Sequence, residues 1–182
     1  MTSSIEFSTA IKQIFFRSKQ GNALVAKLVI AKRDDESTGY IHLGRFSNNY
    51  AGSKFLISCT REEAEWFVDV IPALIKNARA AKPNQYPIVL EKKEFERERS
   101  FELSVSKFKS FKQIDITQSF VRDDNIVTRC VSVPVAEMQN VCKTFKQMLI
   151  AMEIKLNADW KQLNTFSFRI SHILLKPTLE NH

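Results

Sequence analysis

The sequence contains the same series of elements twice, about 74 residues apart, and this duplication limits the possible folds more than any single motif does. The clearest sign is a pair of long amphipathic segments, at 61–81 and 134–157, whose apolar residues recur at steps of three and four. In the first segment these residues are Ala64, Phe67, Val68, Ile71, Leu74 and Ile75, and in the second they are Met138, Val141, Cys142, Phe145, Met148 and Leu149. Each residue of the second set stands 74 positions after its counterpart, so we predict two helices that bury matching faces.

Both helices also carry signals at their starts. Thr60 precedes the first helix and Glu63 follows three residues later, which is the spacing of a capping box, in which each side chain satisfies the other residue's free backbone N–H. Pro134 stands at the start of the second helix, where a first-turn position makes its missing N–H harmless. These signals predict that the helices begin at about residues 61 and 134.

Four segments of strand-like composition precede each helix in the same order. They lie at 11–17, 24–32, 40–46 and 54–60 in the first copy, and at 86–92, 100–107, 114–120 and 128–134 in the second. Turn-forming residues lie between them, at 19–22, 34–39, 47–52 and 122–125. Short connections favour antiparallel meanders, so we predict an α+β fold of two tandem ββββα repeats, with curved antiparallel sheets each packed on a long helix.

The duplication divides the chain into three parts. We predict a first ββββα repeat at 1–83, a second at 84–157 and a C-terminal tail at 158–182, which has no counterpart in the first copy. A polar connector with two prolines, at 80–87, separates the repeats. We expect the tail, which contains a strand-like segment at 165–175, to pack on the repeats or on a partner subunit.

Composition limits the environment and the partners of the chain. The 27 Lys and Arg residues exceed the 20 Asp and Glu residues, and the net charge of +7 favours a polyanionic partner. Cys59, Cys130 and Cys142 are odd in number and form no Cys-x-x-Cys pair, which argues against a disulfide framework and against a zinc site. The N-terminal segment lacks the apolar core of a secretory signal, and no apolar run reaches the ~18 residues of a membrane span. We expect a soluble intracellular protein, nuclear or cytoplasmic, with an organelle presequence left open.

Catalysis finds little support in the sequence. His42, His172 and His182 are isolated, and neither a metalloprotease motif, a nucleophile elbow nor a glycine-rich phosphate loop is present. Cys59 stands at a strand-to-helix junction, where the helix N-terminus could stabilise a thiolate, although a small buried residue is the simpler interpretation. We therefore predict a protein that is not an enzyme and has no cofactor, no metal and no small-molecule substrate.

The sequence supports a binding function better than catalysis, because a sheet that is covered by a helix on one face leaves its other face open. Basic and aromatic residues occur together on or beside the strands, which suits single-stranded nucleic acid: bases stack on aromatic rings for roughly 1–3 kcal/mol each while Lys and Arg contact phosphates. The candidates are Arg17, Lys27, Arg45, Phe46, Tyr50, Lys54, Lys107, Phe108, Lys109, Phe111 and Lys112. The alternative is that about half of these Phe residues are core, since most of the 14 Phe residues must be buried.

The duplicated order of elements, over residues 11–157, resembles the superfamily of single-stranded nucleic-acid-binding proteins that includes PUR, Whirly and the single-strand-binding transcriptional coactivators. The Gly-Arg-Phe tripeptide at residues 44–46 is similar to one that PUR repeats carry on a strand, so the PUR type is slightly preferred. The second copy has Gln-Ser-Phe at 118–120, and the Lys-Gly-Lys-Ala segment typical of Whirly proteins is absent. The resemblance implies the architecture, binding of nucleic acid, possible work in transcription, and roles for Arg45 and Phe46.

Two hypotheses follow. The first is a protein that binds single-stranded DNA or RNA across its strand surfaces, as a homo-oligomer such as a dimer. The rival is a protein-interaction or oligomerisation module whose positive charge is incidental. Under the first, Lys and Arg should line one sheet face; under the rival, they should be scattered.

Overall fold

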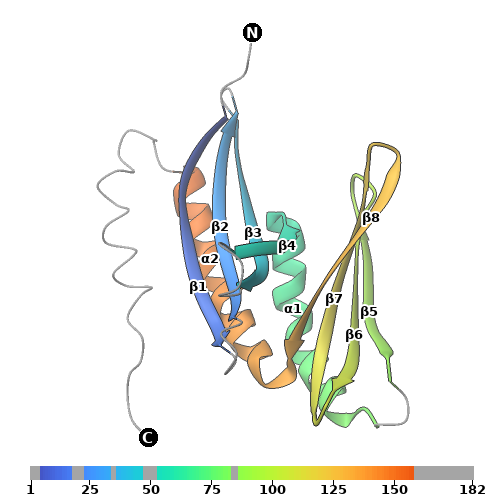
Figure 1. Ribbon diagram of the computed structural model, residues 1–182. Coiled ribbons are helices and arrows are strands. Elements are labelled where there is room, and N and C mark those ends of the chain that lie inside the picture. Colours follow the sequence, from blue (N-terminus) through green and yellow to red (C-terminus); the bar gives the residue numbers. More distant parts are fainter. Residues whose placement is uncertain (1–4, 18–22, 34–35, 47–52, 83–85, 158–182) are drawn as a thin grey trace, which may run out of the picture.

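The chain folds into two four-stranded antiparallel sheets, each a meander in sequence order and each followed by a long helix (Figure 1). The computed structural model describes residues 5–17, 23–33, 36–46, 53–82 and 86–157. The first repeat comprises β1 (Ile5–Arg17), β2 (Ala23–Arg33), β3 (Glu36–Phe46), β4 (Ser53–Cys59) and α1 (Arg61–Ala80). The second comprises β5 (Ile88–Phe95), β6 (Arg99–Phe108), β7 (Phe111–Arg122), β8 (Asn125–Pro134), a 3-10 turn η2 (Val135–Glu137) and α2 (Met138–Asn157). The predicted α+β class and the duplicated ββββα order are confirmed.

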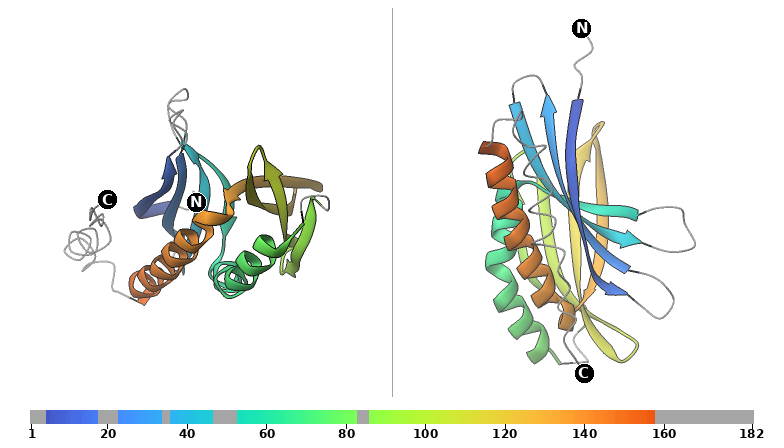
Figure 2. Two further views of the ribbon diagram at one scale, coloured as in Figure 1. Left: turned by 90° about the horizontal axis from the view of Figure 1, so that it is seen from below. Right: turned by 90° about the vertical axis from the view of Figure 1, so that its left-hand side faces the viewer.

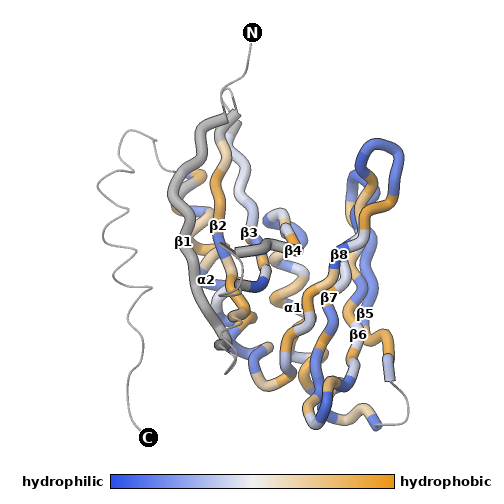
Figure 3. Tube along the Cα trace, viewed as in Figure 1, coloured by the Kyte–Doolittle hydropathy of each residue, from blue (hydrophilic) through white to orange (hydrophobic). Residues whose placement is uncertain are grey.

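Alternation along the strands determines which face of each sheet is buried. On β6 and β7 hydrophobic residues alternate with hydrophilic ones, as the changing colours along these strands show (Figure 3). Phe101, Leu103 and Val105 are buried on the helix side, and their neighbours point to the other face, which we call the open face. On β2 the residues Leu24, Ala26, Leu28 and Ile30 are buried on one face, and at the start of this strand Ala23 and Val25 of the other face are buried as well.

The two sheets lie beside each other in one layer, and both helices lie in a second layer on the same side (Figure 2). The helices are exchanged between the repeats. The second helix, α2, packs against β1, β2 and β3 of the first sheet, whereas α1 packs on β5 and β7 and also touches β3 and β4. One continuous hydrophobic core therefore includes residues from both repeats. The sequence had indicated one helix for each sheet, but only tertiary packing decides which sheet a helix covers.

The two helices run antiparallel and touch near their centres. Pro72 lies inside α1 and has no backbone N–H, so the carbonyl of Val68 lacks its usual intrahelical donor. The Cys142 Sγ of α2 lies 3.8 Å from that carbonyl and donates to it. Val68 and Cys142 are equivalent positions of the two repeats, 74 residues apart. Equivalent positions meet only near the axis that relates two copies, so this contact lies close to a pseudo-two-fold axis.

Most local predictions are confirmed. The capping box of Thr60 and Glu63 is present, and all six predicted apolar residues of α1 are buried. The matching six of α2 are also buried, except Leu149, which is half-buried. All three cysteines are free thiols.

The predicted boundaries need three corrections. Pro134 ends β8 rather than opening a helix, and α2 starts at Met138 after a 3-10 turn. The predicted loop at 34–39 is too long, because β3 already begins at Glu36. The strands are in general longer than their most hydrophobic stretches, because hydrogen bonding continues into the polar hairpin ends. The predicted tail at 158–182 lies outside the described residues.

Gly39 is in close contact with Met152 of α2, and its replacement should be costly. A Cβ added at Gly39 would lie 2.5 Å from Cγ and 2.6 Å from Sδ of Met152, which is fully buried. We expect Gly39→Ala to lower the free energy of unfolding by about 1–3 kcal/mol, as overpacking of a core usually does. Urea denaturation measures the change. In a Met152→Ala background, which removes the obstructing atoms, the same substitution should cost less; an equal cost in both backgrounds would contradict the clash.

Candidate nucleic-acid interface

The best-formed cluster of the predicted site residues is the hairpin between β6 and β7, which we call the basic-aromatic hairpin (Lys107, Phe108, Lys109 and Phe111). Phe108 and Phe111 are paired across the two strands. Their rings meet edge to face, with centroids 5.6 Å apart, and the residues are 51% and 43% exposed. The Lys109 Nζ lies 5.5 Å from the centroid of Phe108. Two aromatic rings are thus held open to solvent beside the Lys109 ammonium group, which is the composition of a stacking site.

Lys109 takes an unusual backbone conformation at the turn. Its φ of 53° lies in the left-handed region, which a residue with a Cβ adopts at some cost. Only two residues connect Phe108 to Phe111. Tight hairpin turns of this length place their first connecting residue, here Lys109, at a positive φ. The turn therefore holds the Lys109 side chain at the tip, next to Phe108.

Lys112 belongs to the same hairpin but has a different role. It is paired with Lys107 across the strands, yet its Nζ donates to three backbone carbonyls at the end of α1. The distances are 3.1 Å to Ala78 O, 2.6 Å to Arg79 O and 2.8 Å to Ala81 O. The last carbonyls of a helix have no intrahelical donors, and a cation there also opposes the negative end of the helix dipole. The three protons of this ammonium cap α1, so we leave Lys112 out of the proposed surface.

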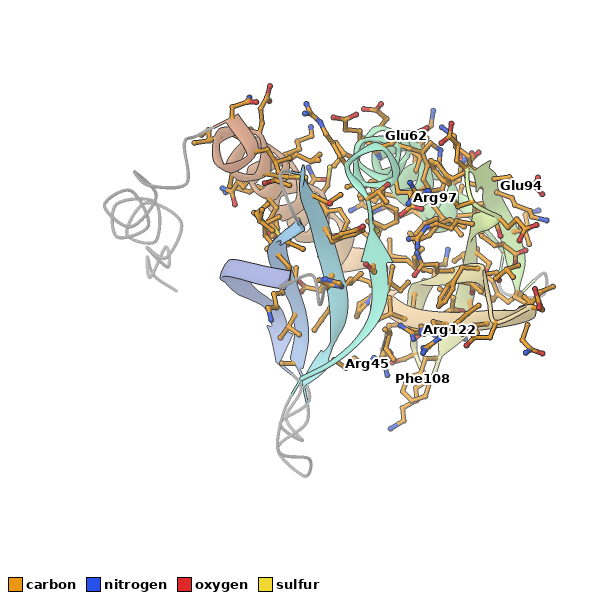
Figure 4. The ribbon with its side chains drawn as sticks, turned by 90° about the horizontal axis from the view of Figure 1, so that it is seen from above. Arg45, Glu62, Glu94, Arg97, Phe108 and Arg122 are labelled. Carbon is orange, nitrogen blue, oxygen red and sulfur yellow. The ribbon has the colours of Figure 1, made fainter. Side chains whose placement is uncertain are left out.

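Two candidates of the first repeat, Arg45 and Lys27, have side chains that the structure describes, and they lie on β3 and β2 of the other sheet. Arg45 is exposed and donates from Nη2 to the carbonyl of Ser132 on β8, at 3.2 Å. Arg45 and Phe108 both lie on the side of the molecule away from α1 (Figure 4). Lys27 is half-buried on β2 opposite His42, whose pKa is lowered by burial and, to a smaller extent, by the charge of Lys27. Tyr50 and the side chains of Arg17, Phe46 and Lys54 lie outside the described part of the structure.

The open face of the second sheet is lined by small polar side chains and also carries the acidic residues Glu94, Glu102 and Asp115. Register and alternation place on it Ser100, Ser104, Ser106, Thr117, Ser119, Thr128 and Ser132. Lys92 is the single Lys or Arg among the residues of β5–β8 on this face, and it stands opposite Glu102. In this sheet the basic residues therefore lie at the ends and edges, and do not line the face as the nucleic-acid hypothesis had predicted.

The junction between the sheets depends on four residues that were not among the candidates. Arg99 donates to the Glu63 carboxylate from Nε at 2.5 Å and from Nη2 at 2.8 Å, and also from Nη2 to Ser58 O at 2.6 Å. Gln118 both donates to Ser58 O, at 2.8 Å, and accepts from Ser58 N, at 3.2 Å. Gln118 is 1% exposed. The sequence did contain one signal for this junction. Gln118 is in phase with the buried Ile114 and Ile116, and a buried amide needs hydrogen-bond partners.

Among the described residues, Cys59 lacks the surroundings of a reactive thiol. Cys59 is buried, and burial together with the nearby Glu63 carboxylate raises the pKa of its thiol, so a stabilised thiolate is wrong for this position. Trp66 contacts Phe95 and Phe101, with centroids 5.5 and 6.0 Å away, and so completes the core.

Within the described ranges, the acidic, His and Cys residues form no group of three that could hold a metal ion. Neither α1 nor α2 combines the length and the apolar character that crossing a bilayer requires.

Comparison with known proteins finds likenesses among solved structures. No family model matches the sequence, and no curated protein matches it. Among solved structures the chain is similar to the crystal structure of WHY3 from Arabidopsis thaliana, with 13% sequence identity and a TM-score of 0.35. The match covers 90% of this chain and 98% of that chain. A TM-score below 0.5 does not establish a common fold, so the architecture rests on this chain's own strands and helices, and the preferred PUR type stays a prediction.

Proposed function

We propose that this protein binds single-stranded DNA or RNA through the basic-aromatic hairpin, with Arg45 as a second, separate contact. The observation that carries the proposal is the exposed Phe108–Phe111 pair with Lys109 over one of its rings. Stacking of a base on an aromatic ring contributes roughly 1–3 kcal/mol and needs little sequence information, because every base has a π-face. Lys109 supplies charge beside the Phe108 ring, and Lys107, exposed at the same hairpin end but on the opposite face of the sheet, supplies charge for a phosphate that passes the tip. The net charge of +7 favours a polyanion.

The positions of the cations shape the expected binding mode. Ser132, to which Arg45 donates, is paired with Asp115 on β7, four residues from Phe111. Four residues of a strand span about 13 Å, so a short single strand could reach from the hairpin to Arg45. The sheet face between them carries hydroxyl groups, the Gln113 amide and the Asp115 carboxylate, with the Gln113 amide donating to Ser106 Oγ at 3.1 Å and to Asp115 Oδ1 at 2.9 Å. Few phosphates would be neutralised, so salt dependence should be moderate.

Removal of the two aromatic rings is the main test. We expect Phe108→Ala with Phe111→Ala to weaken binding of a fluorescent single-stranded oligonucleotide by about tenfold or more, because one or two stacked bases lose their platform. Fluorescence anisotropy measures the dissociation constant, with a duplex of the same sequence titrated in parallel. Both Phe side chains are already about half exposed, so the variant should keep its fold.

A matched control is available at the other end of the same sheet. Val121 and Ile126 are also an exposed apolar pair next to a hairpin turn, 39% and 78% exposed. Their double substitution to Ala should leave affinity unchanged. An equal loss in both double variants, or wild-type binding that is as strong for the duplex, would count against the hairpin as the site.

The lysines can be tested without harm to the fold. Lys109→Gly relieves the positive φ and should keep or slightly raise stability. With Lys107→Gln added, two phosphate contacts are lost, so the slope of log affinity against log salt should fall by about 1.4 for a single strand. The aromatic variant should leave that slope unchanged, which separates stacking from charge.

A further inference from the structure

The outer surface of the helix layer has its charges separated along the helix axis. On α1 the exposed residues at steps of three and four form one stripe: Glu62, Glu65, Asp69, Pro72, Ala73, Lys76 and Arg79. Its first half is acidic, its centre is small and uncharged, and its second half is basic. The stripe lies opposite the buried face of α1, so the first sheet and the second sheet both leave it open.

The neighbouring helix extends this separation. The two helices run antiparallel, as the 3.8 Å approach of Arg61 on α1 to Glu153 near the end of α2 shows. Glu153 is exposed at the acidic end, and Lys143 is exposed on the half of α2 that runs beside the basic end of α1. The exposed Glu153 and Lys143 of α2 therefore continue the charge separation of the α1 stripe, with Arg61 as a cation at the acidic end.

Apolar surface accompanies the charges. At the basic end an open groove of about 600 Å³ lies between the helices, lined by Pro72, Ile75, Lys76, Arg79, Ala80 and Gln139. Toward the acidic end, Ile150 and Ile154 of α2 are 60% and 45% exposed, one helical turn apart. Two large apolar side chains exposed one helical turn apart are typical of a surface that a partner covers.

We propose that two copies of this chain associate through their helix layers, with the α1 helices antiparallel across a two-fold axis. Such an axis presents the same patch twice, so the patch must be complementary to its own reversed copy. Placed between Asp69 and Pro72, it sets Glu62 opposite Arg79 of the second copy and Glu65 opposite Lys76, and the reverse pairs follow by symmetry. Glu62 and Arg79 lie about 25 Å apart along the helix, so the matched charges span most of its length.

The second copy is favoured over another partner because the surface carries its own complement. A polyanion or a purely acidic peptide would match only one end and would be repelled by the other. At the centre Pro72 and Ala73 allow the two helices to approach closely, and the groove beside them receives the partner's helix. The strand side stays open in such a dimer, because the helices lie in one layer and the strands in the other (Figure 2).

Charge reversal with mixing tests the proposal on the full chain. One variant carries Glu62→Lys and Glu65→Lys, and a second carries Lys76→Glu and Arg79→Glu. Sedimentation equilibrium at low and high salt measures the dimer dissociation constant, and thermal melts check that both variants fold. Each variant alone should dimerise at least about tenfold more weakly than the wild type, because like charges now face each other. An equimolar mixture should form a heterodimer, and salt should weaken it by screening.

The control reverses two exposed charges elsewhere. Glu94→Lys with Glu96→Lys changes the net charge as much as the first variant does but lies on the β5–β6 hairpin, and it should dimerise like the wild type. The proposal is overturned if the wild type stays monomeric up to about 100 μM at low salt, because a dimer with a higher dissociation constant would be weak even for a transient contact. It is also overturned if both reversal variants dimerise as well as the control, since another surface would then form the dimer.

Discussion

A chain that ends at residue 83 is expected to remain unfolded, although it contains four strands and a helix of one complete repeat. The reason is the exchange of helices: α2 of the second repeat covers β1, β2 and β3. Without α2, the core residues beside Gly39, which are Leu28, Ile30 and Ile41, would face water. Burial of each such side chain contributes about 1.5–3 kcal/mol, so losing three approaches the whole stability of about 5–15 kcal/mol of a typical domain.

Far-UV circular dichroism and urea titration of the fragments 1–83 and 84–182 check this expectation. Each fragment alone should show no cooperative transition, and co-expression of the two should restore one. A cooperative transition in 1–83 by itself would show that the proposed division at residue 83 is a folding boundary. We propose instead that it is a boundary of the duplication only, since one core includes both repeats.

The second large effect is expected at the junction of the two sheets. Arg99→Ala removes both hydrogen bonds to the buried Glu63 carboxylate, whose side chain is 2% exposed. Glu63 would keep its bond from the Thr60 N–H but would be a buried charge without a counter-ion. Breaking a buried pair from one side usually costs about 3–5 kcal/mol. In a chain of this length that corresponds to a fall in Tm of about 6–20 °C.

Calorimetry of the variant and of a matched control measures this effect. Arg61→Ala removes an ion pair of similar length, 2.8 Å to Glu65, but both side chains there are 51% exposed, so little change is expected. Adding Glu63→Gln to Arg99→Ala should recover part of the loss, because the buried group is then neutral. A fall in Tm as small as that of Arg61→Ala would mean that water replaces the Arg99 guanidinium at no cost.

The site was only partly predictable from the sequence. The basic-aromatic hairpin could be found because Lys107, Phe108, Lys109 and Phe111 are neighbours in the chain, and a tight turn keeps them together. Lys112 looked equivalent to Lys107, but its ammonium caps α1, which is an assignment that depends on where the helix ends in space. Arg99 and Gln118 donate hydrogen bonds to Ser58 O across sequence separations of 41 and 60 residues. No local sequence pattern predicts a contact between residues so far apart in the chain.

The sequence by itself determined what depends on neighbours along the chain. Periodicity of three and four residues fixed the buried faces of α1 and α2, the capping box fixed the start of α1, and the 74-residue offset fixed the duplicated order of elements. Only the tertiary structure decided that each helix lies beneath the other repeat's sheet and that basic residues stay at the edges of the second sheet. The physical reason is that an apolar stripe specifies burial but not a partner, and two copies of one unit offer each helix two similar sheets. Shape at close contacts, such as Met152 on Gly39, makes the choice between them.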